Sequence, residues 1–168
     1  MIKTIKFHLL LTFLNTFLTG TRFFILKRSI LNCIGINVGK GSCIVGPIKV
    51  GRIAKLEIGK DCWIGANFTV HGNGKVKINN NCDIGPDVTI ITGSHEIGSK
   101  ERRAGKGVTW IYNIGSGTWI GAKATISNGS NIGNGVVIGA CSLITKDCED
   151  NSLYLGSPAK KVKELEII

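Results

Sequence analysis

Large aromatic side chains and proline are both scarce in this 168-residue chain. Aromatic residues make up 7% of it and three residues are proline, whereas 23 are glycine. An ordinary globular domain fills its centre with large side chains, so this composition favours a repetitive, turn-rich β structure. The length suits one domain with a modest core, and a hydrophobic content of 43% excludes a disordered chain.

The cysteines lack the spacing of a metal site. None of the six forms a C-x-x-C pair, and no histidine cluster accompanies them. We therefore expect no zinc site and no bound metal. No secretory cleavage pattern is evident, which argues against a disulfide framework. We interpret the cysteines as reduced, packed thiols of a cytoplasmic protein.

Acidic residues are few, with 11 Asp and Glu against 21 Lys and Arg, so the net charge is +10. A basic chain suits phosphate-bearing ligands, an anionic membrane surface or nucleic acid. We discount nucleic acid as a partner, because no helix-turn-helix, zinc-finger or aromatic stacking motif accompanies the charge.

A period of six residues dominates the chain. Isoleucine recurs in a single phase at positions 78, 84, 90, 114, 120, 126, 132, 138 and 144. Two upstream sets, Val38 to Leu56 and Ile58 to Val76, keep the period in frames shifted by two residues, which a bulge at a corner could absorb. Neither a helix nor a free strand has this period. Three hexads would form one coil of a parallel β-helix, with the aliphatic rows inside a narrow prism.

Small side chains usually occupy the fifth place of each hexad. These residues are Cys82, Val88, Thr118, Ala124, Ser130, Val136, Ser142 and Cys148. A small residue fits where three walls converge, so a cysteine at this place needs no chemical role.

The six-residue period is interrupted once, within TGSHEIGSKERRAGKG, and resumes in the same phase at Ile114. His95 stands at the break, before an excursion over residues 96–113. A flat prism wall offers no pocket, and an overhanging excursion would build one. Imidazole titrates near neutral pH, which makes His95 a candidate general base. The alternative is a solvent-facing turn histidine.

The stretches on both sides of the break are CDIGPDVTIITGSHE and NIGSGTWIGAKATISNGSNIGNGVVIGACSLITKDCEDNSLYLGSPAKKV. They resemble the hexapeptide-repeat acyltransferases, and within them the sugar O-acetyltransferase branch that contains the maltose and galactoside acetyltransferases. The resemblance implies an all-β fold, a left-handed parallel β-helix over residues 33–150, and a homotrimer with sites between neighbouring prisms. It also implies acetyl-CoA as co-substrate, direct transfer to a sugar or glycan hydroxyl, and His95 as the general base.

The same resemblance implies further site residues. Asn67 corresponds to an acceptor-binding asparagine, although a turn asparagine is an equal alternative. Trp119 corresponds to a tryptophan that lines the site near both ligands. The expected CoA-binding residues are Gly121, Ala140, Thr145, Lys146 and Lys160, of which Lys160 replaces an arginine that contacts the CoA phosphates.

Two features of the excursion leave alternatives open. The orienting partner of His95 could be Glu96 or Asp87, or both could be ordinary surface carboxylates. The excursion carries four basic residues: Lys100, Arg102, Arg103 and Lys106. They would suit an acidic or phosphate-bearing acceptor, and a solvated loop is the alternative.

The two ends depart from the repeat. Residues 1–32 are apolar with basic edges, and Lys6, His8, Asn15 and Arg22 interrupt any membrane-spanning run. We expect either an interfacial helix, peripheral at the inner face of the cell membrane, or a helix that caps the first coil. Residues 151–168 are expected to form a helical or extended tail that closes the other end.

The sequence thus predicts an O-acetyltransferase that acts on a bacterial envelope polysaccharide or its precursor. The alternative enzymes acetylate serine or a small molecule such as an antibiotic or free sugar. A zinc hydratase on the same prism would need three histidines, and the repeats hold two, His71 and His95. The non-enzyme alternative is a β-helix scaffold subunit.

Overall fold

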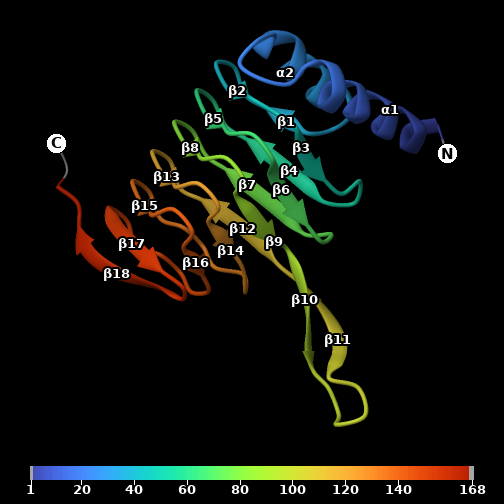
Figure 1. The fold of residues 1–168 in the computed structure, drawn as a ribbon. Coiled ribbons are helices and arrows are strands. Elements are labelled where there is room, and N and C mark those ends of the chain that lie inside the picture. Colours follow the sequence, from blue (N-terminus) through green and yellow to red (C-terminus); the bar gives the residue numbers. More distant parts are fainter. Residues whose placement is uncertain (1, 167–168) are drawn as a thin grey trace.

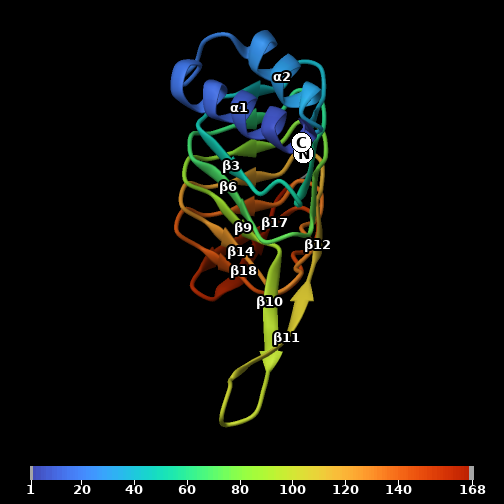
Figure 2. The same ribbon diagram turned by 90° about the vertical axis from the view of Figure 1, so that its right-hand side faces the viewer.

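The computed structural model describes residues 2–166. Two helices, α1 (Ile2–Phe17) and α2 (Phe24–Cys33), precede a stack of short strands. The strands form the walls of a three-sided prism, with the helices across its first coil (Figures 1 and 2). No helix in this part of the chain has the length and apolar character that a membrane span requires.

Three parallel sheets make the walls. Wall A contains β1 (Asn37–Val38), β4 (Lys55–Ile58), β7 (Lys75–Ile78) and β12 (Ile111–Ile114). Wall B contains β2 (Cys43–Ile44), β5 (Trp63–Ile64), β8 (Asp83–Ile84), β13 (Trp119–Ile120), β15 (Val137–Ile138) and β17 (Ser152–Gly156). Wall C contains β3 (Ile48–Val50), β6 (Phe68–His71), β9 (Thr89–Ile91), β14 (Thr125–Ile126) and β16 (Leu143–Ile144). The predicted parallel β-helix is confirmed.

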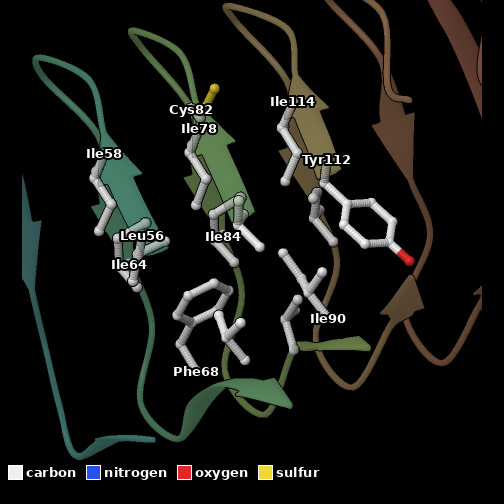
Figure 3. Packing of buried hydrophobic residues seen from close by; sticks show 14 of the residues in the cluster. Leu56, Ile58, Ile64, Phe68, Ile78, Cys82, Ile84, Ile90, Tyr112 and Ile114 are labelled. Carbon is white, nitrogen blue, oxygen red and sulfur yellow. The ribbon is translucent and has the colours of Figure 1, made fainter. Parts of the chain in front are cut away.

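The aliphatic rows fill the prism. Ile58, Ile78 and Ile114 stand in register on consecutive strands of wall A, and Figure 3 shows them as one row inside the cluster. Each is at most 4% exposed. Full burial of such a side chain contributes about 1.5–3 kcal/mol relative to exposure, so the rows hold successive coils together. The cysteines predicted at the fifth place, Cys82 and Cys148, are buried thiols as expected. Cys33 and Cys141 are exposed, so the expectation of packed thiols is wrong for these two.

The two-residue frame shifts lie at one corner of the prism. Val38, Ile58 and Ile78 pair in register 20 residues apart, whereas Ile114 and Ile132 pair 18 apart. The extra residues belong to the turns between walls C and A, hereafter the C–A corner. They lie at a corner, as predicted, where they lengthen the turn. Leu56 and Val76 were assigned to the main rows by period alone. Both are buried inside the prism as the period predicts, but they stand two residues before the row of Ile58, Ile78 and Ile114: Leu56 pairs with Val76, and Val76 pairs with Tyr112.

Three polar side chains of the helices close the open end of the prism. The Asn15 side-chain amide donates to Ile48 O at 2.7 Å and accepts from Ile48 N at 3.0 Å. Asn32 makes the same pair of bonds with Val38 O and N. The Lys27 ammonium donates to Val45 O at 3.0 Å and to Gly20 O at 2.6 Å. Edge strands otherwise leave backbone groups unpaired, so the helices cap the first coil.

The C-terminal segment is extended. Strand β17 pairs with β15 and continues wall B beyond residue 150, and β18 (Ala159–Glu164) folds back antiparallel on β17. Of the two alternatives for this tail, the extended one is confirmed for the described residues, and residues 167–168 lie outside them.

Candidate functional site

The break in the repeat is a β-hairpin. Strands β10 (Gly93–Ile97) and β11 (Ala104–Thr109) pair antiparallel, with His95 opposite Gly107. The hairpin stands out from the prism at the C–A corner (Figure 2). It begins at Gly93, not at residue 96, and wall A resumes at Ile111. His95 therefore lies on the hairpin itself, because the pairing begins three residues before the predicted start of the excursion.

Buried side chains fix the root of the hairpin. The Thr92 hydroxyl donates to His71 O at 2.7 Å and accepts from Gly74 N at 2.9 Å. The fully buried Tyr112 donates its hydroxyl to Ile91 O at 2.7 Å and accepts from Gly129 N at 3.0 Å. Burial raises the pKa of this phenol. Both ends of the hairpin are thus tied to neighbouring coils, which holds His95 in place.

His95 faces a polar hollow. This open cavity of about 590 Å³ is lined by Gly72, Asn73, Gly93, Ser94, His95, Gly107, Val108 and Thr109. The Thr109 hydroxyl donates to the Asn73 side-chain oxygen at 3.0 Å, and His95 and Ser94 are exposed. An imidazole, an amide and two hydroxyls around one cavity can bind and orient a polyhydroxylated ligand.

Asp87 and His95 of one chain lie at different corners of the prism, so Asp87 does not orient the His95 of its own chain. The Asp87 carboxylate accepts a hydrogen bond from the Asn67 side-chain amide at 2.9 Å. Both residues lie in turns between walls B and C, hereafter the B–C corner, with positive φ angles of 59°. That corner is not the one that carries the hairpin. Glu96 is exposed on β10 beside His95.

Three of the expected CoA-binding residues meet in a second hollow. Thr145, Lys146 and Lys160 line a cavity of about 340 Å³ between the turn after β16 and the β17–β18 hairpin. Lys161 also lines it and forms ion pairs with Glu149 at 2.7 Å and Glu164 at 3.1 Å, which raise its pKa. Lys146 and Lys160 are exposed and supply positive charge that suits phosphate groups.

The other expected site residues lie elsewhere on the same chain. Gly121 and Ala140 stack at the B–C corner, where a Cβ on Gly121 would stand 2.5 Å from Ala140 N. Trp119 is 57% exposed on wall B. Asn67 occupies the B–C corner. The fold therefore divides the expected residues between two edges of the prism.

Sequence reasoning did not single out Asn73, Thr109, Tyr112 or Trp110. Trp110 packs against Gly129, whose Cβ would lie 2.9 Å from the indole ring. The available signal was the scarcity of aromatics, because two of the five Trp and Tyr residues stand at the return from the break. Asn73 and Thr109 are 36 residues apart and gave no signal.

Residues 112–146 match the model of the family described as bacterial transferase hexapeptide (six repeats). The chain is 28% identical to the galactoside O-acetyltransferase of Escherichia coli strain K12, over 83% of this chain and 68% of that protein. It is 35% identical to a putative acetyltransferase of Schizosaccharomyces pombe, over 66% of this chain. The chain spans about half the length of that second relative, 54%.

A solved structure also matches most of the fold. It is described as a galactoside acetyltransferase in complex with coenzyme A, and the TM-score is 0.81 at 26% identity. The match covers 98% of this chain and 81% of that one.

Proposed function

We propose that this chain transfers an acetyl group from acetyl-CoA to a sugar hydroxyl. The premise is that the chain belongs to the hexapeptide-repeat transferases and is homologous to the galactoside O-acetyltransferases. The observation that carries this proposal is the position of His95 in a polar hollow at the root of a hairpin that interrupts an otherwise regular repeat.

His95 acts as the general base in this proposal. Acetyl-CoA supplies the activated acetyl group as a thioester. The imidazole accepts the proton of the acceptor hydroxyl as that oxygen attacks the thioester carbonyl carbon. The new C–O ester bond replaces the C–S bond, CoA leaves as the thiolate, and the imidazolium returns the proton to it. The Asn73 amide and the Thr109 and Ser94 hydroxyls line the same hollow and bind neighbouring hydroxyls of the acceptor.

The basic hollow around Lys146 and Lys160 binds the phosphate end of CoA. The turn 145–147 lies at the C–A corner, as the hairpin does, and β16 is two strands from β9 in wall C. Strands in a sheet are about 4.8 Å apart, so the turn lies roughly 10 Å along the prism axis from the hairpin root. An extended co-substrate can span this separation.

The division of the site residues between two edges supports a homotrimer. Asn67, Gly121 and Ala140 lie at the B–C corner, whereas His95 and Thr145 lie at the C–A corner. If neighbouring prisms place one corner against the other, each site is completed by two protomers, with Trp119 on the wall beside it. A closed ring of such heterologous contacts has three members on a three-sided prism.

The acceptor in this proposal is a glycan of the bacterial envelope or its precursor. The enzyme acts in the cytoplasm, the compartment in which acetyl-CoA and reduced thiols occur together. The tip of the hairpin carries the exposed Lys100, Arg102 and Arg103, with Glu101 3.9 Å from Lys100. Net positive charge there favours an acceptor with carboxylate or phosphate groups. Acetylation of serine or of a small molecule would not need this charge.

Calorimetric titration of the protein with acetyl-CoA tests the proposal without knowledge of the acceptor. We expect saturable binding at one equivalent per protomer, weakened at least tenfold in Lys146→Gln/Lys160→Gln. Lys163→Gln is the matched control, because Lys163 is exposed on the same strand as Lys160 but does not line the hollow. Absence of binding by folded protein would favour the scaffold alternative.

A further inference from the structure

Helix α1 has a second apolar face besides the one that packs on the prism. Phe7 and Leu14 face the prism and are buried, and Asn15 makes its paired hydrogen bonds on that side. The second face exposes five large apolar side chains at 44–82% of their surface: Ile2, Ile5, Leu9, Phe13 and Phe17. At 100° per residue these five centre about 130° away from the buried pair. An exposed cluster of large apolar side chains on a helix marks a surface that interacts with a second apolar environment.

The exposed face is a continuous patch. Ile2, Ile5, Leu9 and Leu10, with Lys6 among them, line a largely apolar hollow along it, and the rings of Phe13 and Phe17 lie 5.4 Å apart. Phe23 and Ile25, at the start of α2, add exposed apolar surface at 59% and 72%. Phe23 also has a φ of 57°, an unusual backbone conformation for a bulky residue. Patches of this kind mark interaction surfaces.

The charge of the chain is concentrated at this end. Residues 1–56 contain nine Lys and Arg and no Asp or Glu, whereas residues 57–168 contain twelve against eleven. Lys3 and Lys6 are exposed on α1, and Arg22 is exposed in the connection to α2. Nine of the ten units of net charge thus belong to residues 1–56, and three of them, Lys3, Lys6 and Arg22, are exposed on α1 or in its connection to α2. A partner with both an apolar interior and a negative surface fits this combination.

We infer that the outer face of α1, with Lys3, Lys6 and Arg22 on it or beside it, docks on an anionic lipid bilayer. The apolar side chains enter the boundary between headgroups and acyl chains, and the basic residues attract the anionic headgroups. The strength of attachment scales with the buried apolar area plus the electrostatic attraction to anionic lipids, so the two contributions add. The helix lies in the plane of the surface, since it is too short to span the bilayer. The inference does not depend on His95 or on acetyl transfer.

Co-sedimentation with vesicles tests the inference. The two preparations are phosphatidylcholine alone and phosphatidylcholine with roughly 30% phosphatidylglycerol, which mimics an anionic leaflet. We expect the intact protein to bind the anionic vesicles. Binding should fall when the ionic strength rises from about 0.1 M to about 1 M, because the screening length shortens from about 10 Å to about 3 Å.

Two variants separate the contributions. Leu9→Ser/Phe13→Ser/Phe17→Ser should lower the partition coefficient at least tenfold, and Lys3→Gln/Lys6→Gln should lower it about fivefold for each lysine removed. The matched controls alter exposed residues elsewhere, Ile111→Ser/Val162→Ser and Lys100→Gln/Lys163→Gln, and should bind as the parent does. Circular dichroism and acetyl-CoA binding of the α1 variants should be unchanged, so failure here is distinct from failure of the proposed function.

Three results would overturn the inference. The folded protein could fail to bind anionic vesicles, or it could bind neutral vesicles equally well. Sedimentation velocity could instead show an assembly that the Leu9→Ser/Phe13→Ser/Phe17→Ser variant disrupts without any vesicle binding by the parent. In that last case the face belongs to an interface between copies of this chain.

Discussion

The paired hydrogen bonds of Asn15 allow a quantitative test of how the prism is capped. Its amide satisfies both the N–H and the C=O of Ile48 on the edge strand of wall C, in place of the coil that is missing there. Asn15→Ala would remove two hydrogen bonds, each worth about 0.5–1.5 kcal/mol, and would leave two backbone groups at a largely buried strand edge. We expect a loss of about 2–3 kcal/mol in the free energy of unfolding, or about 4–12 °C in melting temperature for a chain of this size.

Two further variants show whether the loss comes from the hydrogen bonds. Thr16→Ala alters an exposed neighbour on the same helix and should change stability by less than about 0.5 kcal/mol. Asn15→Asp keeps the acceptor but sets a carboxylate against Ile48 O, so it should be at least as harmful as Asn15→Ala at neutral pH. Its deficit relative to the parent should shrink as the pH falls toward about 4, because the protonated acid can again donate.

Urea unfolding at one fixed protein concentration measures these differences, because assembly couples stability to concentration. The reasoning is refuted if Asn15→Ala and Thr16→Ala are equally stable. The helices would then hold the end of the prism by apolar burial alone.

Three other substitutions test the packing of the prism. Gly121→Ala should lower the free energy of unfolding by about 1–3 kcal/mol, because its Cβ would stand 2.5 Å from Ala140 N. Gly107→Ala, whose Cβ would meet nothing within 4 Å, is the control, and equal melting temperatures of the two variants would contradict the prediction. Tyr112→Phe removes both hydrogen bonds of the phenol and should lower the free energy of unfolding by about 2 kcal/mol. Tyr154→Phe loses a single hydrogen bond from Glu149 N and should lose less stability; a larger loss in Tyr154→Phe would argue against a fixed hairpin root. Burial raises the pKa of the Cys148 thiol from 9.0 to about 12, so above pH 9 the unfolded chain releases a proton that the folded chain keeps. The free energy of unfolding then falls by about 1.4 kcal/mol per pH unit between these two pKa values. Urea unfolding of Cys148→Ala should lack this part of the pH dependence, and parallel pH profiles for the parent and the variant would exclude the explanation.

The repeating walls could be predicted from the sequence because each hexad is a local pattern. Ile84, Ile120 and Ile138 occupy the same place in every coil, and their spacing alone specifies a parallel β-helix. The position of the extra residues could not be predicted, because it depends on register between coils. Leu56 follows Val50 by six residues, as a member of the Ile58–Ile78–Ile114 row would. Only its pairing with Val76 shows that Leu56 stands two residues before that row.

The roles of isolated polar residues were also beyond sequence reasoning. Asn15 appeared only as an interruption of an apolar run, whereas the structure uses it to pair with a strand edge 33 residues away. Asn67 fitted a binding role by resemblance, and its hydrogen bond to Asp87 depends on a contact between adjacent coils. His95 was visible because it stood at the one break in a strict period.

The most direct test of the proposed mechanism compares two histidines near the same corner. His71 and His95 are both exposed, and only His95 lines the hollow under the hairpin. With an acceptor identified by screening envelope sugars, the rate of CoA release is measured at saturating substrates for the parent, His95→Ala and His71→Ala. The account predicts that kcat falls about 10²–10⁴-fold in His95→Ala, with its melting temperature unchanged, and that His71→Ala turns over as the parent does. Parental turnover in His95→Ala would contradict the account.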